Sequence, residues 1–222
     1  MASTEDQAAD PPESRRGRPR GATLSQDDVV EAAARLAADG LEHLSMSALA
    51  AQLGVTPMAV YRHVRDKEHL LALLLDTALR RVRVPGPNDG SWEERLHALH
   101  RRVTRALQRY PGLLFDISVE SDAGARLLDA YLKILLDAGF DARVAAQAYT
   151  GLYYLAIGTV TNAHRRTTAS PILDAPDGMS DRSGTVRAHR AALGTSRQRF
   201  EDFALDTYIA GLTALLRTSN SS

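Results

Sequence analysis

The stretch that most constrains the fold runs from residue 44 to residue 67 and reads LSMSALAAQLGVTPMAVYRHVRDK. Gly54 divides it, because glycine ends a helix in the left-handed conformation without strain. Before Gly54, apolar residues recur at helical spacing. After it, Thr56-Pro57 restarts the chain with a capping residue and a proline whose missing N–H costs nothing at a first helical position. The stretch therefore predicts two short helices joined by a tight turn.

The second short helix has two different faces. Val60 and Val64 lie four residues apart and share one face, so we expect them to be buried. Met58 and Arg62, also four apart, must then point outward. Two helices joined by a glycine turn, the second presenting an arginine, are typical of units that place a helix in the DNA major groove. An ordinary helical hairpin within an all-helical domain has the same pattern and stays an alternative at this point.

The residues after this helix favour the DNA-binding interpretation. The run Tyr61-Arg62-His63 is followed by Asp66-Lys67, which opens the next helix. Over LAAQLGVTPMAVYRHVRDKEHLL the sequence resembles the TetR family of transcriptional repressors, whose recognition helix ends in a Tyr-x-His run before a short turn and a lysine. This resemblance implies a helix-turn-helix DNA-binding domain, which we expect over residues 23–67.

Composition bounds the class of protein. A chain of 222 residues that is 44% hydrophobic and 24% charged can bury one large core or two small ones. Its formal net charge is zero, so any attraction to nucleic acid must be local. Without cysteine there are no disulfides or thiolate metal sites. No apolar run approaches the roughly 20 residues that span a bilayer, and the polar first residues are unlike a secretion signal. We therefore expect a cytoplasmic protein with no membrane partner.

Residues 1–22 predict a disordered arm with a basic end. The first part is acidic and has no apolar periodicity. RRGRPRG then reverses the charge directly ahead of the first expected helix. Arg18 and Arg20 could reach phosphates or the minor groove beside the recognition helix. A solvated charge run is the alternative, and the position next to a DNA-binding unit favours the arm.

Helices are expected along the rest of the chain, so the predicted fold class is all-α. The first spans about 25–40, and a connecting helix spans 66–82, with an apolar stripe wide enough to contact units on both sides. After the breaker PGPNDG, further helices are expected at 91–110, 122–139, 141–166 and 196–217. Residues 112–122 predict a connecting turn or a short helix, and residues 167–196 a mobile loop.

The back half resembles the tetracycline-repressor-like branch of the same family. The likeness lies in the helix start SWEERL, the junction AGFD and the long loop before the last helix. It implies that residues 68–222 form an effector-binding and dimerisation domain. The last helix is apolar over much of its surface, which also favours a homodimer. A dimer would bind double-stranded operator DNA with inverted-repeat symmetry.

The predicted DNA contacts are of two kinds. Arg62 is the candidate for reading a base, because arginine pairs with guanine through two hydrogen bonds. Met58 and Ala59 could contact thymine methyl groups. The family resemblance implies phosphate contacts from the helix starts and from the end of the recognition helix, and the expected set is Ser45, Ser47, Thr56, Tyr61, His63 and Lys67. Pro57 is also expected at the DNA-binding surface.

For two residues of this set, Ser47 and His63, the expected contact differs from that of relatives or has an alternative. Tetracycline-responsive relatives carry a base-reading arginine at the position of Ser47, so we expect a different operator here. His63 has an alternative role, in which its side chain packs against the neighbouring helix.

The resemblance also implies an effector pocket. Matching by SWEERL and AGFD puts Leu99, Val103, Phe115 and Tyr131 on pocket positions. Phe115 falls where tetracycline-binding members have a magnesium-ligating histidine, and Arg83 where they have a second drug-contacting histidine. We therefore predict no metal or cofactor, and an effector that is not tetracycline with magnesium but a less polar molecule, largely apolar or aromatic.

Polar contacts to the effector could come from His100, Tyr153, Tyr154 and Asn162. For each of these four residues taken singly, a place in the core or in an interface is the simpler explanation.

Other functions are less well supported. The seven histidines show no HExxH spacing, and neither a glycine-rich phosphate loop nor GxSxG occurs, so we predict no catalytic site and no enzyme. His97 and His100 are three apart and could hold zinc, but no carboxylate motif completes the site. A dimeric DNA-binding protein without any effector stays open as the alternative. Repression is the usual mode of the family, and the residues do not distinguish it from activation.

Overall fold

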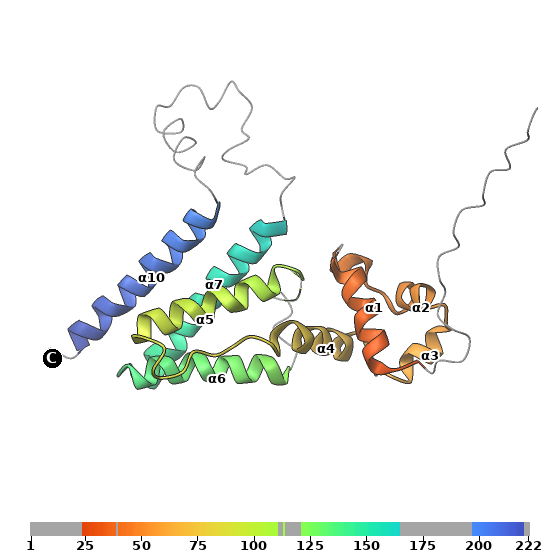
Figure 1. Ribbon diagram of the computed structural model, residues 1–222, viewed down its shortest axis with the longest axis horizontal. Coiled ribbons are helices and arrows are strands. Elements are labelled where there is room, and N and C mark those ends of the chain that lie inside the picture. The colour runs from red at the N-terminus through yellow and green to blue at the C-terminus, as the bar shows by residue number, and fades with distance from the viewer. Residues whose placement is uncertain (1–23, 39, 111–112, 114–120, 165–196, 220–222) are drawn as a thin grey trace, which may run out of the picture.

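A computed structural model describes residues 24–38, 40–110, 113, 121–164 and 197–219. These residues contain helices and no strand, which confirms the predicted all-α class (Figure 1). The elements, in order, are α1 (Gln26–Ala38), the 3-10 helix η1 (Leu41–His43), α2 (Met46–Leu53), α3 (Pro57–Tyr61), α4 (Lys67–Leu79), α5 (Trp92–Leu107), α6 (Asp122–Asp137), α7 (Ala142–His164) and α10 (Arg197–Ser219).

Side-chain caps start the helices where the sequence predicts them. The backbone N–H of Ser25 donates to Asp28 at 2.9 Å, and the N–H of Asp28 donates back to the Ser25 hydroxyl at 3.1 Å. Ser91 and Glu94 make the same reciprocal pair, with distances of 2.8 and 3.2 Å. Each pair satisfies two backbone amides that have no partner in the first helical turn.

The predicted turn between the two short helices is also present. Gly54 has φ 67° and ψ 32°, the left-handed conformation that glycine adopts without strain. Thr56 then caps α3 by accepting a hydrogen bond of 3.3 Å from the N–H of Ala59. The 3-10 turn η1 was not predicted. It follows Gly40, whose φ of 132° lets the chain reverse after α1.

The described residues form two hydrophobic cores. The first is formed by α1, α2, α3 and the first half of α4, together with Tyr110 and Leu113. The second is formed by the end of α4 with α5, α6, α7 and α10. Leu75 and Ala78, in the second half of α4, pack against both cores. The connecting helix therefore contacts both units, as its wide apolar stripe predicts. The domain boundary after Lys67 stays a prediction.

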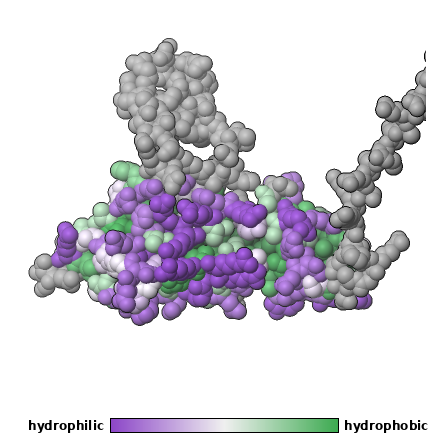
Figure 2. Space-filling model, in the orientation of Figure 1, coloured by the Kyte–Doolittle hydropathy of each residue, from purple (hydrophilic) through white to green (hydrophobic). Residues whose placement is uncertain are grey.

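Figure 1 shows α4 between the group α1–α3 and the layered helices α5, α6, α7 and α10. In Figure 2 the visible face is covered mainly by hydrophilic residues, with smaller apolar patches between them.

The connecting helix ends earlier than expected. α4 stops at Leu79, whereas the apolar pattern predicted an end near Val82. The N–H of Val82 donates to the carbonyl oxygen of Leu79 at 2.9 Å, a tight turn in place of a further helical turn. The guanidinium of Arg126 then binds the carbonyl oxygens of both residues at 3.2 Å. A side chain from another helix thus satisfies the end of α4, which the local pattern does not reveal.

Candidate DNA-binding surface and effector cavity

The recognition helix α3 has the two faces that its sequence predicts. Val60 and Val64 are 0% and 1% exposed and anchor α3 in the first core. Met58 is 67% exposed, and Arg62 is exposed as well. Arg62 is the residue that caps the C-terminus of α3. Met58 and Arg62 are therefore free to approach a ligand from outside, and their contact with bases stays a prediction.

The other predicted DNA contacts lie at helix ends around α3. Ser45 is the N-cap of α2, where its hydroxyl accepts from the N–H of Ala48 at 3.1 Å. The exposed members of the set are Ser45, Ser47, Thr56, Pro57, Tyr61 and Lys67, while Ala59 and His63 are half-buried. Arg18 and Arg20 lie outside the described residues. The surface thus carries several hydroxyl groups and two helix starts, which are suited to phosphate oxygens.

Two residues beside the recognition helix were missed. Gln26, at the start of α1, donates a hydrogen bond of 3.0 Å from its side chain to the carbonyl oxygen of His63. This hydrogen bond connects α1 to the end of the recognition helix, and no local sequence pattern predicts it. Arg65 is an exposed cation between α3 and α4. Its place between His63 and Lys67 was a readable signal for a phosphate contact.

A cavity of about 760 Å³ lies among the helices of the second core. Its wall is formed by side chains from α4, α5, α6 and α7, together with Leu113 and Ser121. Most of the wall is leucine, valine and tyrosine, including Leu75 and Leu79 from α4. This volume lies in the range of about 300–1,000 Å³ typical of small-molecule sites.

The predicted effector residues fall in four groups. His100, Val103, Tyr131 and Tyr153 line the cavity. Leu99 is 0% exposed and belongs to the surrounding core, but it is not part of the lining. Tyr154 is 66% exposed on the outside of α7. Phe115 lies outside the described residues, and at Asn162 the structure describes the backbone alone. For all of them an effector contact stays a prediction.

His100 and Tyr131 are the deeply buried polar groups of the cavity wall. Each is 4% exposed, and their ring centroids lie 6.5 Å apart. Neither side chain has a hydrogen-bond partner within the described residues. Both side chains line the cavity, so a ligand held there would lie beside them. A ligand that supplies partners here would gain hydrogen bonds that these two side chains do not make within the described residues.

Burial keeps both groups neutral. Desolvation, with a smaller contribution from the charge of His97, lowers the pKa of His100 to about 4. Desolvation, with a contribution from Tyr149, raises the pKa of Tyr131. At pH 7 the imidazole thus offers one donor and one acceptor, and the phenol offers a hydroxyl that can do either.

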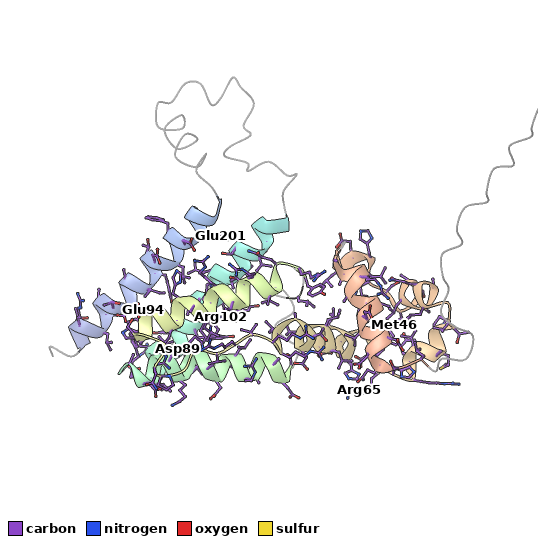
Figure 3. All side chains as sticks on the ribbon, viewed as in Figure 1. Met46, Arg65, Asp89, Glu94, Arg102 and Glu201 are labelled. Carbon is purple, nitrogen blue, oxygen red and sulfur yellow. The ribbon has the colours of Figure 1, made fainter. Side chains whose placement is uncertain are left out.

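Arg83 does not reach the cavity. It is exposed and pairs with Asp89 at 2.9 Å, and its carbonyl oxygen accepts a hydrogen bond of 3.0 Å from Arg102. The backbone N–H of Gly86 and the charge of Arg83 lower the pKa of Asp89. Figure 3 shows Asp89 and Arg102 near one another, around the segment that carries Arg83. Arg83 therefore belongs to a surface network.

The histidine pair on α5 does not converge on a metal site. His97 pairs with Asp206 of α10 at 3.2 Å, whereas His100 lines the cavity. Within the described ranges, no group of three or more histidine, cysteine, aspartate or glutamate side chains could hold a metal ion. In the same part of the chain, no helix combines the length and the apolar character needed to cross a membrane.

The outer sides of α7 and α10 carry large apolar residues. Tyr154 on α7 and Phe203 and Leu215 on α10 are 66%, 67% and 56% exposed. The two helices are held together by a hydrogen bond of 3.0 Å from the hydroxyl of Tyr208 to the carbonyl oxygen of Ala148. Exposed side chains of this size on adjacent helices are suited to burial against a second subunit.

The chain has a helix-turn-helix unit that presents the outer face of α3. Through α4 this unit is joined to a helical unit with a cavity. This arrangement is that of helix-turn-helix DNA-binding regulators. The family described as bacterial regulatory proteins, tetR family, matches residues 29–74. The tetracyclin repressor-like C-terminal domain matches residues 84–216. The chain belongs to the TetR family of transcriptional regulators, as its sequence motifs predict.

Individual relatives agree with this assignment. The transcriptional repressor DrrR1 of Streptomyces coeruleorubidus is 40% identical over 115 residues, which cover 51% of this chain and 43% of DrrR1. This chain thus spans less than half of that relative. The class E tetracycline repressor protein of Escherichia coli is 27% identical, and the match covers 88% of this chain and 93% of that repressor.

Among solved structures, ActR of Streptomyces coelicolor in complex with (S)-DNPA superposes with a TM-score of 0.71. It is 25% identical, and the match covers 87% of this chain and 98% of ActR.

Proposed function

We propose that this protein is a ligand-responsive repressor that binds an inverted-repeat operator as a dimer and releases it when a small molecule fills the cavity. One observation carries the proposal: Leu75 and Leu79 of α4 line the cavity, while Leu70 and Leu74 of the same helix are buried in the core of the DNA-binding unit. A molecule in the cavity would therefore touch the helix on which that unit is mounted. The solved complex of ActR with (S)-DNPA supports a ligand for this fold.

The DNA-binding part of the proposal uses the outer face of α3. Arg62 reads a guanine, Met58 and Ala59 contact thymine methyl groups, and hydroxyl groups at the helix starts contact phosphates. The arm of residues 1–22 adds Arg18 and Arg20. In this proposal residues 23–67 form the DNA-binding domain and residues 68–222 form the effector-binding and dimerisation domain. The protein acts in the cytoplasm, where bacterial operator DNA lies.

Dimerisation is supported by the apolar outer sides of α7 and α10. Packing Tyr154, Phe203 and Leu215 against a second copy would bury side chains that are more than half exposed in the single chain. Two-fold symmetry would then set two α3 helices about 34–36 Å apart, or a multiple of that spacing, on one side of the duplex.

Release follows from thermodynamic linkage. If the effector fits only the arrangement in which the two recognition helices do not match the groove spacing, it lowers the affinity for DNA. The DNA must then lower the affinity for the effector by the same factor. A core without space would favour the alternative of a DNA-binding protein that has no effector, whereas a cavity of about 760 Å³ supports the ligand-responsive function.

The proposal is tested by mapping the DNA that the protein protects upstream of its own gene. Arg62→Ala should weaken binding to the mapped site by about 1–3 kcal/mol at constant salt, measured by fluorescence anisotropy. Arg143→Ala is the matched control, because it removes an exposed arginine from α7, far along the chain from α3. Equal affinity of the Arg62 variant and the wild type would reject the assigned base contact.

A further inference from the structure

The charge of the cavity wall is one-sided. Asp122, an exposed residue at the start of α6, is the single charged residue among the described residues that line the cavity. Neither lysine nor arginine is part of that lining, and the next basic residue on α6, Arg126, donates to carbonyl oxygens at the end of α4. An anionic ligand would therefore lose its hydration without gaining a countercharge. A cationic group next to Asp122 would gain one.

The neutral hydrogen-bonding groups lie further along the same helix. Tyr131 is nine residues after Asp122 on α6, which corresponds to about 14 Å along the helix axis. His100 faces the same space from α5, with its ring centroid 6.5 Å from that of Tyr131. Both side chains lack partners within the described residues, so both can bind a ligand. The separation between the carboxylate and this pair favours an elongated ligand.

The wall between these two ends is apolar and aromatic. Val103, Leu127 and Leu152 contribute aliphatic surface. Tyr149 lies beside Tyr131 with a centroid distance of 5.6 Å and a tilt of 58° between the rings. Flat ligands gain from contact with aromatic faces and edges in such a site.

We infer that the cavity binds an elongated aromatic molecule whose hydroxyl or carbonyl groups bond to His100 and Tyr131 and whose basic amine lies next to Asp122, and that it discriminates against carboxylates. The inference rests on the proposed function, since the cavity is the effector site of that proposal. It adds the charge, the length and the hydrogen-bonding pattern of the ligand.

The test compares two probes with one aromatic body. Both are 1,8-dihydroxyanthraquinone, carrying either an aminomethyl or a carboxyl group at the same ring carbon. Binding to the full-length protein is measured by isothermal titration. We expect the amine to bind at least about tenfold more tightly than the carboxylate, because only the amine gains a charge-assisted contact.

Variants separate the two ends of the site. Asp122→Asn should remove most of the preference for the amine. Asp129→Asn, an exposed position on the same helix outside the lining, should retain it. Tyr131→Phe should weaken both probes by about two- to tenfold, the loss of one hydrogen bond. Tyr110→Phe, a buried tyrosine of the other core, should leave binding unchanged. Circular dichroism confirms that each variant is folded.

The outcomes distinguish the inference from the proposed function. If the carboxylate binds as tightly as the amine, or if neither probe binds, the ligand class assigned here is wrong. Should the carboxylate alone release operator DNA, the repressor proposal stands and the ligand class fails. If the amine binds with the expected dependence on Asp122 and Tyr131 but leaves operator affinity unchanged, the ligand class stands and the effector role fails. Unchanged binding in Ala156→Trp, which fills the cavity, would place the probe elsewhere and overturn the inference.

Discussion

Arg126 of α6 donates a hydrogen bond of 3.2 Å to the carbonyl oxygen of Leu79, the last residue of α4. In the opposite direction, the carboxylate of Asp76 on α4 accepts hydrogen bonds at 2.6 Å from the hydroxyl of Ser121 and at 2.8 Å from the N–H of Ala123, at the start of α6. A cation thus caps the C-terminus of α4, and a carboxylate caps the N-terminus of α6, as the helix dipoles favour. A side chain of each helix thus caps one terminus of the other helix.

This reciprocal capping predicts that Asp76→Ala destabilises the protein. The change leaves part-buried donors at the start of α6 without a partner, so we expect a loss of about 1–3 kcal/mol in the free energy of unfolding. Urea unfolding followed by circular dichroism measures it. Asp129→Ala, which removes an exposed carboxylate from α6, is the control and should change stability by less than about 0.5 kcal/mol. Equal stabilities of the two variants would show that the Asp76 contacts contribute little.

The two faces of α3 predict opposite phenotypes. Val60→Ala creates a cavity beside a side chain that is 0% exposed, so it should lower the free energy of unfolding by about 1–3 kcal/mol. Met58→Ala changes a side chain that is 67% exposed, so it should leave stability unchanged and weaken binding to the mapped operator. Thermal unfolding and fluorescence anisotropy separate the two effects. A strongly destabilised Met58 variant with unchanged operator affinity would contradict the assigned faces.

The buried imidazole of His100 predicts a pH dependence of stability. Its pKa is about 4 in the folded protein and near 6.5 in the unfolded chain, so between these values the unfolded state binds more protons. Stability should therefore fall by about 2 kcal/mol as pH is lowered from 7 to 5, and this contribution should be flat above pH 7. Comparison of denaturant unfolding for wild type and His100→Phe isolates it, because the remaining histidines are common to both. An identical pH slope in the two proteins would argue against a neutral buried imidazole.

The apolar outer side of α10 predicts a dimer that a single charge can break. Phe203→Glu or Leu215→Glu would bury an unpaired carboxylate in the proposed interface, so either variant should sediment as a monomer at micromolar concentration. Leu136→Glu is the matched control: this leucine is 46% exposed but lies on α6. It should stay dimeric. A wild-type protein that is already monomeric at that concentration would remove the basis of the dimer.

Much of the candidate site was readable from neighbouring residues. The caps at Ser25 and Ser91 and the left-handed turn at Gly54 use contacts within three or four positions, and the structure contains all three. The faces of α3 follow from the four-residue spacing of Val60 and Val64. Such signals are local, because a helix brings residues three and four apart together whatever surrounds it.

The cavity depended on contacts that no local spacing encodes. Leu99 and Val103 lie on one buried face of α5, yet only Val103 lines the cavity, because the packing of α6 and α7 leaves space beside one and not the other. Asp76 has the sequence context of an ordinary polar residue within an apolar stripe, and it became a helix cap because α6 docks onto α4 from 45 residues further along the chain. Local caps and helix faces are thus properties of short segments, whereas the end of α4, empty space and long-range partners arise only when whole helices are packed together.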